Sequence, residues 1–332
     1  MKRIYKPASS IAVTATASAV GYEEYRGRFG EYFDFHDDSD LFGADTWEHA
    51  EGNLGYTVFG LLMKKAGLTP DRIDLLFAGD LQNQCVASSE GLVSTGIPYL
   101  GLYAACSTVC ESMVVATMAI NANENLQNAC IVTTSHNCAA ERQFRLPLEY
   151  GGQRPPTAQW TATAGGGFLL SRGDRGAVLT EVMPGRMIDA GISDASNMGA
   201  AMAPAVVDTL CDYFRESGAS PYDFDVILTG DLGFEGSAIL DKLMADEGIP
   251  LEGRHRDCGA MMYDPRKQDV HCGGSGCGCS ASMMAAYFIP EIEKGNIRNM
   301  LFLATGALMS PGSIQQGGHI IGIAPLVRLE AK

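Results

Sequence analysis

Apolar residues recur in a pattern that appears twice along this chain. Around Leu54–Leu62 and again around Val206–Phe214 they are spaced so that they share one face of a helix. Each helical pattern is followed by a turn with proline and then by a short apolar run, Asp74–Phe77 or Asp225–Leu228, that ends near a glycine. Such runs are typical of strands that helices cover on both faces. The order of elements therefore predicts a layered α/β protein.

The two patterns belong to an internal repeat. Gly67–Leu81 and Gly218–Leu232 are identical at six of fifteen positions, and the second begins 151 residues after the first. A second pair, Asn125–Thr134 and Asn296–Thr305, follows in the same order. A repeat of this length indicates a duplicated unit, in which each half reads helix, turn, buried strand, Gly/Cys turn, helix, buried strand.

Composition and charge narrow the class of protein. The chain has 332 residues, 46% of them apolar and 19% charged, which is typical of a globular protein. Its net charge of −15 argues against a nucleic-acid partner and against direct binding to an anionic membrane surface. The ten cysteines are too few for a disulfide scaffold and there is no apolar signal core, so we expect a cytoplasmic protein with reduced thiols.

Cys106 follows a short strand-like run and two alanines, and an uncharged helix-like run comes after it. Small residues permit a sharp turn from strand to helix. At the start of a helix the dipole favours thiolate over thiol, which predicts a nucleophile. The alternative is that Cys106 is a buried apolar residue, as most free cysteines are.

Several segments carry a resemblance to a known family. The turn AACSTVCESM at Ala104–Met113 resembles the nucleophilic-cysteine turn of the thiolase superfamily, in particular its ketoacyl-synthase III branch. The whole chain resembles the stage V sporulation protein AD family of endospore formers, on the segments Ala78–Gln84, Thr134–Pro155, Gly273–Ala281 and Ala304–Pro311.

The resemblance implies a thiolase-like α/β/α/β/α fold of five layers, with two pseudo-twofold-related halves at residues 1–185 and 186–332. It also implies a homodimer that binds dipicolinic acid (pyridine-2,6-dicarboxylate), or its calcium chelate, and assists dipicolinate uptake into the developing spore. The implied partners are the SpoVA membrane proteins, which would hold this cytoplasmic protein at the forespore or spore inner membrane. No cofactor is implied.

A condensing enzyme of the superfamily needs two further groups, a histidine and a histidine or asparagine, beside its cysteine. Where the resemblance places them, this chain has Gly230–Leu232 and Gly273–Ser275. We therefore expect a degenerate active site. The rival is an active acyl-thioester transferase or condensing enzyme that uses Cys106, with His136 or His255 as the base; the alternative for both histidines is a structural role.

For a dicarboxylate ligand, Arg142 and Arg145 are the candidate partners, because a guanidinium matches a carboxylate with two parallel hydrogen bonds. The alternative is a surface helix on which Glu141 pairs with Arg145. The remaining candidates are the residues around the cysteine turn and the second glycine turn: Cys106, Ser107, His136, Gly274 and Ser275.

A metal site was the third interpretation. The cysteines and histidines between His255 and Cys279 are soft ligands, but their spacing lacks a paired C-x2-C framework, so we predict no metal.

Overall fold

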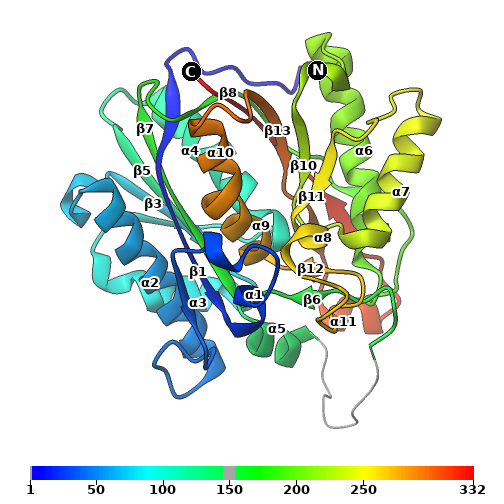
Figure 1. Ribbon diagram of the computed structural model, residues 1–332, viewed down its shortest axis with the longest axis horizontal. Coiled ribbons are helices and arrows are strands. Elements are labelled where there is room, and N and C mark those ends of the chain that lie inside the picture. Colours follow the sequence, from blue (N-terminus) through cyan, green and yellow to red (C-terminus); the bar gives the residue numbers. More distant parts are fainter. Residues whose placement is uncertain (1, 145–153) are drawn as a thin grey trace.

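A computed structural model gives the fold of residues 2–144 and 154–332 (Figure 1). In this part of the chain the main sheet has eleven strands, and ten of them follow one path. Its first-half strands are β1 (Ile11–Gly21), β3 (Leu75–Gly79), β4 (Tyr99–Gly101), β5 (Asn128–Ser135) and β7 (Ala164–Arg172). Its second-half strands are β8 (Ala177–Met183), β10 (Val226–Thr229), β11 (His255–Asp257), β13 (Asn299–Leu303) and β16 (Leu326–Glu330).

The two sets of strands have the same order. From the outer edge inward they run β4-β3-β5-β7-β1 and β11-β10-β13-β16-β8. In both sets the outer three strands are parallel and the inner two are antiparallel to their neighbours. A short antiparallel pairing of β1 with β8 joins them, and β2 (Phe35–Asp37) extends the end of β1. Division of the chain after residue 185 stays a prediction.

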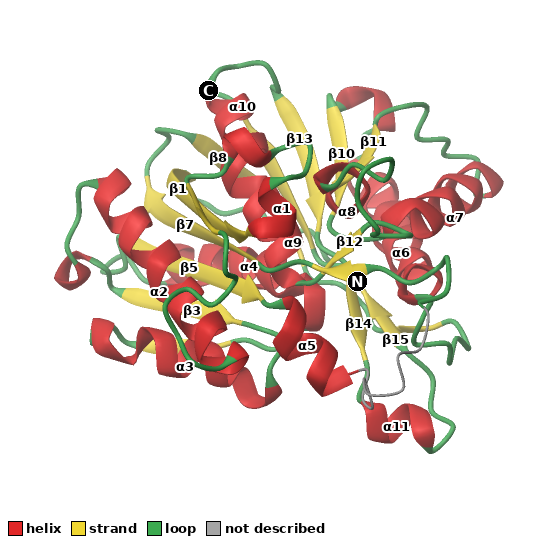
Figure 2. Ribbon diagram, turned by 60° about the horizontal axis from the view of Figure 1, so that its bottom comes forward, coloured by secondary structure: helices red, strands yellow, loops and turns green. Residues whose placement is uncertain are grey.

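Helices form three layers around these strands (Figures 1 and 2). The outer layers contain α2 (Trp47–Ala66) with α3 (Val86–Leu92), and α6 (Met198–Ser217) with α7 (Gly233–Asp246). The central layer contains α4 (Thr108–Ala122) and α9 (Cys277–Met283), which continues through a π-helical turn into α10 (Ile289–Glu293). Shorter helices are α1 (Tyr22–Tyr25), α5 (Asn137–Phe144), α8 (Cys258–Met262) and α11 (Pro311–Gln315).

The hydrophobic core follows the same layers. One cluster joins α4 and α9 to both sets of strands, for example Met113 with Phe168 and Phe302. Separate clusters lie under α2 and under α6. Apolar burial therefore connects all five layers, and the predicted α/β/α/β/α architecture with two related halves is confirmed.

The repeat extends to individual hydrogen bonds. The carboxylate of Asp74 accepts a bond from the backbone N–H of Asn128 at 2.9 Å, and Asp225 accepts one from Asn299 at 3.2 Å. The side-chain amide of each asparagine donates to a backbone oxygen two residues before the aspartate, at 3.1 Å and 2.8 Å. An equivalent aspartate and asparagine therefore fix the equivalent pair of parallel strands in each half.

Two small sheets lie beside the cysteine turn. The strand β6 (Trp160–Thr161) pairs with β12 (Gly274–Ser275), and β9 (Ile188–Asp189), β14 (Gly306–Leu308) and β15 (Ile321–Ile323) form an antiparallel group. Because they join segments that are far apart in sequence, they bring residues of both halves to one place.

Candidate functional site

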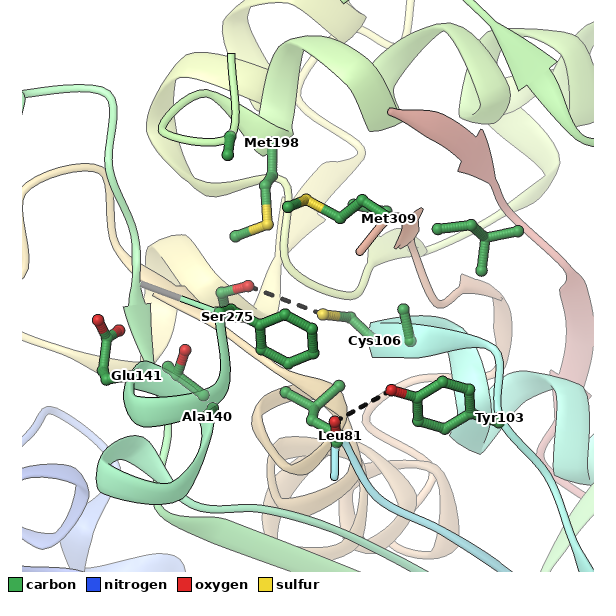
Figure 3. Close-up of a pocket in the computed structure, with 14 residues that line it drawn as sticks. Leu81, Tyr103, Cys106, Ala140, Glu141, Met198, Ser275 and Met309 are labelled. Atoms are coloured by element: carbon green, nitrogen blue, oxygen red, sulfur yellow. Dashed lines mark hydrogen bonds between the residues drawn. The ribbon is translucent and has the colours of Figure 1, made fainter. Parts of the chain in front are cut away.

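A cavity of about 250 Å³ lies where the two halves meet (Figure 3). Its wall is mainly apolar. The lining residues come from the cysteine turn, from α5, from the start of α6 and from the small sheets: Leu81, Tyr103, Ala105, Cys106, Ala140, Glu141, Phe144, Thr161, Ala195, Met198, Ser275, Ala307, Leu308 and Met309. The candidate residues Cys106 and Ser275 are thus brought together, although 169 positions separate them.

The cysteine turn has the sharp geometry that its small residues predict. Ala105 has a φ of 49°, in the left-handed region that side chains other than glycine rarely adopt. This places Cys106 at the cavity wall, one short turn before α4 begins. Ser107 points elsewhere, because its buried hydroxyl donates to the carbonyl of Ala104 at 2.8 Å. Ser107 is not among the lining residues.

A buried carboxylate stands behind the cysteine. Asp231, directly after β10, accepts hydrogen bonds from the Ser275 hydroxyl at 2.9 Å, the Gly276 N–H at 2.9 Å and the Thr305 hydroxyl at 2.6 Å. The Ser275 oxygen lies 3.8 Å from the Cys106 sulfur. The thiol, the hydroxyl and the carboxylate therefore form a chain that leads from the cavity into the core.

This arrangement keeps Cys106 a thiol. Burial raises the pKa of Cys106 well above its usual value, and the neighbouring Asp231 carboxylate raises that pKa further. Burial also raises the pKa of Asp231 to about 6, although its hydrogen bonds oppose this shift. The placement of Cys106 does not support the expectation that the thiolate is favoured there, because desolvation and a nearby negative charge both favour the thiol.

Neither candidate histidine lines the cavity. His136 is buried against Trp47, its Nε2 lies 2.8 Å from the backbone oxygen of Asp40, and burial lowers its pKa. His255, on the edge strand β11, lies between Thr229 at 2.9 Å and Asp241 at 3.1 Å. All six histidines of the chain fall in the described ranges, and none is a lining residue. A base role for His136 or His255 stays a prediction that their placement does not support.

The structure directs Arg142 away from the cavity. Its guanidinium pairs with Glu48 of α2 at 3.0 Å on the protein surface. Arg145 lies outside the described residues. Gly274 does not line the cavity, but its carbonyl accepts a hydrogen bond from Gln159 at 2.8 Å, which fixes the strand that carries Ser275. None of the lining residues in the described part of the chain is cationic.

Sequence reasoning missed several lining residues, among them Met198 and Met309, because nothing in their local pattern distinguishes a cavity methionine from a core one. It also noted Asp231 only as the place where a histidine is missing. The repeated Gly-Asp-Leu at the end of a buried strand was the available signal, because buried carboxylates need partners.

Two other interpretations can be compared with the described residues. No group of three or more His, Cys, Asp or Glu side chains is placed there to hold a metal ion, and the Cys277 thiol donates to the carbonyl of Thr134 at 2.9 Å. Within the same ranges one helical stretch, Ala105–Ala122, is long and apolar enough to cross a membrane. Most of it is buried in the central layer of the fold.

Comparison with known proteins decides the family. A family model for stage V sporulation protein AD (SpoVAD) matches residues 2–330. Stage V sporulation protein AD of Bacillus subtilis strain 168 is 39% identical to this chain over 314 residues, which cover 95% of this chain and 92% of that protein. The chain belongs to the SpoVAD family. It is thus a sporulation protein, and the family predicted from the sequence is confirmed.

Solved structures that resemble this SpoVAD family member are condensing enzymes and their relatives. They include the tetronic acid condensing enzyme AbyA1 (TM-score 0.61, 14% identity, 96% of this chain and 99% of that one). The 3-oxoacyl-[acyl-carrier-protein] synthase III of Aquifex aeolicus VF5 has a TM-score of 0.55 and 11% identity over 96% and 99% of the two chains. The priming β-ketosynthase of the R1128 polyketide pathway has a TM-score of 0.57 and 14% identity over 100% and 98%. At these identities the likeness establishes the thiolase-like fold.

Proposed function

We propose that this protein binds dipicolinic acid in the cavity beside Cys106 and performs no thioester chemistry there. The observation that carries the proposal is the chain Cys106–Ser275–Asp231, in which the sulfur faces a hydroxyl and a carboxylate instead of an imidazole. Nucleophilic catalysis needs a thiolate and donors for the oxyanion. A raised thiol pKa beside a negative charge disfavours both, so the site is better suited to binding than to acyl transfer.

The cavity suits a small aromatic ring. Its volume of about 250 Å³ is small, and Phe144, Met198 and Met309 supply an aromatic face and two thioethers, groups that pack well against a ring. The hydroxyl group of Thr161 is within the wall and can donate to a carboxylate, whereas the Ser275 hydroxyl already donates to Asp231.

Calorimetry with dipicolinate tests the proposal. The wild-type chain is expected to bind it saturably, and Met198→Trp, which fills the cavity, is expected to lose at least tenfold in affinity. Met187→Trp is the matched control, because Met187 is 71% exposed and does not line the cavity. Absence of binding by the wild-type chain would refute the proposal.

Mass spectrometry separates this proposal from the rival acyl-thioester enzyme. The protein is incubated with short- and medium-chain acyl-CoA, and the peptide that contains Cys106 is examined for an acyl adduct. We expect no adduct and no release of free CoA, because the thiol stays protonated. Stoichiometric acylation with turnover would establish the enzyme instead.

The arginines can be tested as a pair. Arg142→Ala is expected to change dipicolinate affinity by less than about twofold, because its guanidinium already pairs with Glu48. Arg145→Ala is expected to reduce it by about tenfold or more, the usual effect of losing a charge-assisted hydrogen bond. Equal losses would mean that both arginines contact the ligand, and no loss in either would remove the arginines from the site.

We also propose that the protein is a homodimer through the outer edge at β4. Among the described residues this strand pairs only with β3, and apolar side chains on it and beside it stay exposed: Tyr99 is 37%, Leu100 47% and Tyr103 49% accessible. An open edge with apolar side chains favours pairing with another chain.

Light scattering is expected to show a dimer that Leu100→Asp converts to a monomer, while Met187→Asp leaves it intact. A wild-type monomer would contradict this. Docking to SpoVA membrane proteins stays a prediction.

A further inference from the structure

The question that the cavity raises is how it accommodates negative charge. Dipicolinate is an anion at neutral pH, yet one lining residue, Glu141, is itself acidic. A second carboxylate, Asp231, lies one hydroxyl group behind the wall, because its Oδ2 accepts the bond from the lining residue Ser275 at 2.9 Å. Negative charge on the ligand and on Asp231 would therefore repel each other, and the repulsion is weakly screened because Asp231 is fully buried.

The surroundings of Asp231 determine how this repulsion can be relieved. Ser275, Gly276 and Thr305 all donate to its carboxylate, and no cationic side chain of the described residues does. The titratable groups that face it are the Asp257 carboxyl at the start of α8 and the thiols of Cys106, Cys258, Cys277 and Cys279. Burial raises the pKa of each of these thiols, so they are neutral at physiological pH and cannot compensate an added charge.

A proton can compensate it. Both Asp231 and Ser275 can rearrange around one extra hydrogen without moving heavy atoms, because a protonated carboxyl donates to the serine oxygen where the carboxylate accepted from it. The serine hydroxyl is then free to donate into the cavity, toward a ligand carboxylate. When Asp231 gains a proton, the Ser275 hydroxyl can therefore donate a hydrogen bond to the ligand.

We infer that Asp231 is a positioning residue that takes up a proton when an anionic ligand enters the cavity, and that it turns the Ser275 hydroxyl toward that ligand. This inference rests on the proposed binding of dipicolinate, and it adds the group that couples binding to pH. The cavity therefore binds the aromatic carboxylate together with one proton, so the affinity for this ligand falls as the pH rises.

The direction of the pH dependence follows from the linkage between proton binding at Asp231 and ligand binding. The pKa of Asp231 in the free protein is raised to about 6, and a bound anion one hydroxyl away raises it further. Below pH 6 the carboxyl is already protonated, so little proton uptake accompanies binding. Above pH 6 one proton is taken up per ligand, and the association constant falls by about tenfold per pH unit until the pKa of the complex is reached.

Calorimetry of the unmodified protein measures this directly. Dipicolinate is titrated at pH 7.5 in phosphate and in Tris, whose ionisation heats differ, and the difference in binding heat gives the number of protons exchanged. We expect uptake of about one proton at pH 7.5 and much less at pH 5. Binding with no proton uptake at pH 7.5 would overturn the inference and leave the proposed function standing. No binding at either pH would instead remove the proposed function.

Variants assign the proton to its residue. Asp231→Asn imitates the protonated carboxyl and is expected to bind with higher affinity than wild type at pH 7.5, with no proton uptake and a flat pH profile. Asp80→Asn is the matched control, because Asp80 is also buried after a first-half strand but bonds to Gln82 and Ser88, which do not line the cavity. Glu141→Gln is the second control. Both controls should keep the proton uptake; its loss in Glu141→Gln, or its persistence in Asp231→Asn, would overturn the inference.

Discussion

The two copies of the Gly-Asp-Leu turn occupy equivalent places in the fold, but their aspartates have different hydrogen-bond partners. Asp80 and Asp231 occupy equivalent places, directly after β3 and after β10. Asp80 is held within its own half, by the backbone N–H of Gln82 at 2.8 Å and by the N–H and hydroxyl of Ser88 at 2.8 Å and 2.6 Å. Asp231 is held by three residues from two segments distant in sequence, Ser275 with Gly276 and Thr305, and lies beside Cys106 of the other half.

This difference shows how a duplicated unit acquires one site. The first copy of the aspartate supports a local turn, and the second supports a cavity that contains a side chain from the opposite half. Each aspartate also has an acidic neighbour: in addition to burial, the charge of Asp80 raises the pKa of the buried Glu51 carboxyl, and the charge of Asp257 raises the pKa of Asp231. What distinguishes Asp231 is the thiol of Cys106 beside it.

The largest expected effect comes from removing each carboxylate. Asp231→Ala leaves buried donors on Ser275, Gly276 and Thr305 without an acceptor, and should cost about 3 to 4 kcal/mol of unfolding free energy. Asp80→Ala should cost only about 1 to 2 kcal/mol, because the loss of its bonds is offset by less repulsion on Glu51. Denaturant unfolding measures both. Equal costs would show that the two turns are energetically equivalent.

A second comparison concerns the pH at which buried carboxyls of the two halves weaken the fold. Burial raises the pKa of Glu24 to about 8, although the Tyr263 hydroxyl donates to it at 2.5 Å. The folded chain holds this proton more tightly than the unfolded chain, so Glu24 contributes stability at low pH that is lost as the pH rises. Between pH 6 and 8 the loss should be about 2 to 3 kcal/mol, and Glu24→Gln should remove it.

For Asp231 the corresponding window lies lower, between its ordinary value of 3.8 and about 6. Asp231→Asn should therefore flatten the stability profile between pH 4 and pH 6 and leave the range from pH 6 to 8 unchanged. Unfolding in denaturant at a series of pH values, for wild type and both variants, gives the two windows. A single common window would mean that the two carboxyls titrate as one coupled group.

The smallest effect is expected where the halves are alike. Asp74→Ala and Asp225→Ala each remove an exposed carboxylate that accepts backbone N–H bonds from the neighbouring parallel strand, and each should cost about 1 kcal/mol. The double variant should show the sum, since the two sites share no partner. Urea titration of the three variants checks this. Strong non-additivity would indicate that the halves unfold as a coupled pair through the central layer.

Sequence and structure agree where the information is local or repeated. The helices around Leu54–Leu62 and Val206–Phe214 and the strands after Asp74 and Asp225 form as their patterns predict, because helical and strand periodicity are properties of neighbouring residues. The sharp turn at Ala105 was also predicted, because small residues leave room for a close turn from strand to helix, although a left-handed φ is rare for alanine. Cys106 and Ser275 were both chosen as site residues, and both line the cavity.

The predictions were weaker for charged and polar side chains. Arg142 was chosen for its chemistry, but whether it faces the cavity or Glu48 depends on how α5 packs against α2. His136 and His255 were chosen because imidazoles are common bases, but their hydrogen bonds to Asp40, Thr229 and Asp241 are made by segments distant in sequence. Contacts between segments that are distant in sequence cannot be predicted from one sequence before its fold is known.

The sequence by itself therefore determined the duplication, the layered architecture, the cysteine turn and the family. All of these are carried by periodicity, by small residues in a row or by motifs that can be read along the chain. Only the tertiary structure decided that the thiol form of Cys106 is favoured, because this depends on Asp231, on Ser275 and on burial of the sulfur, three conditions that exist only when both halves are folded together. Electrostatic energies depend on distance and burial in three dimensions, and neither is written in the order of residues.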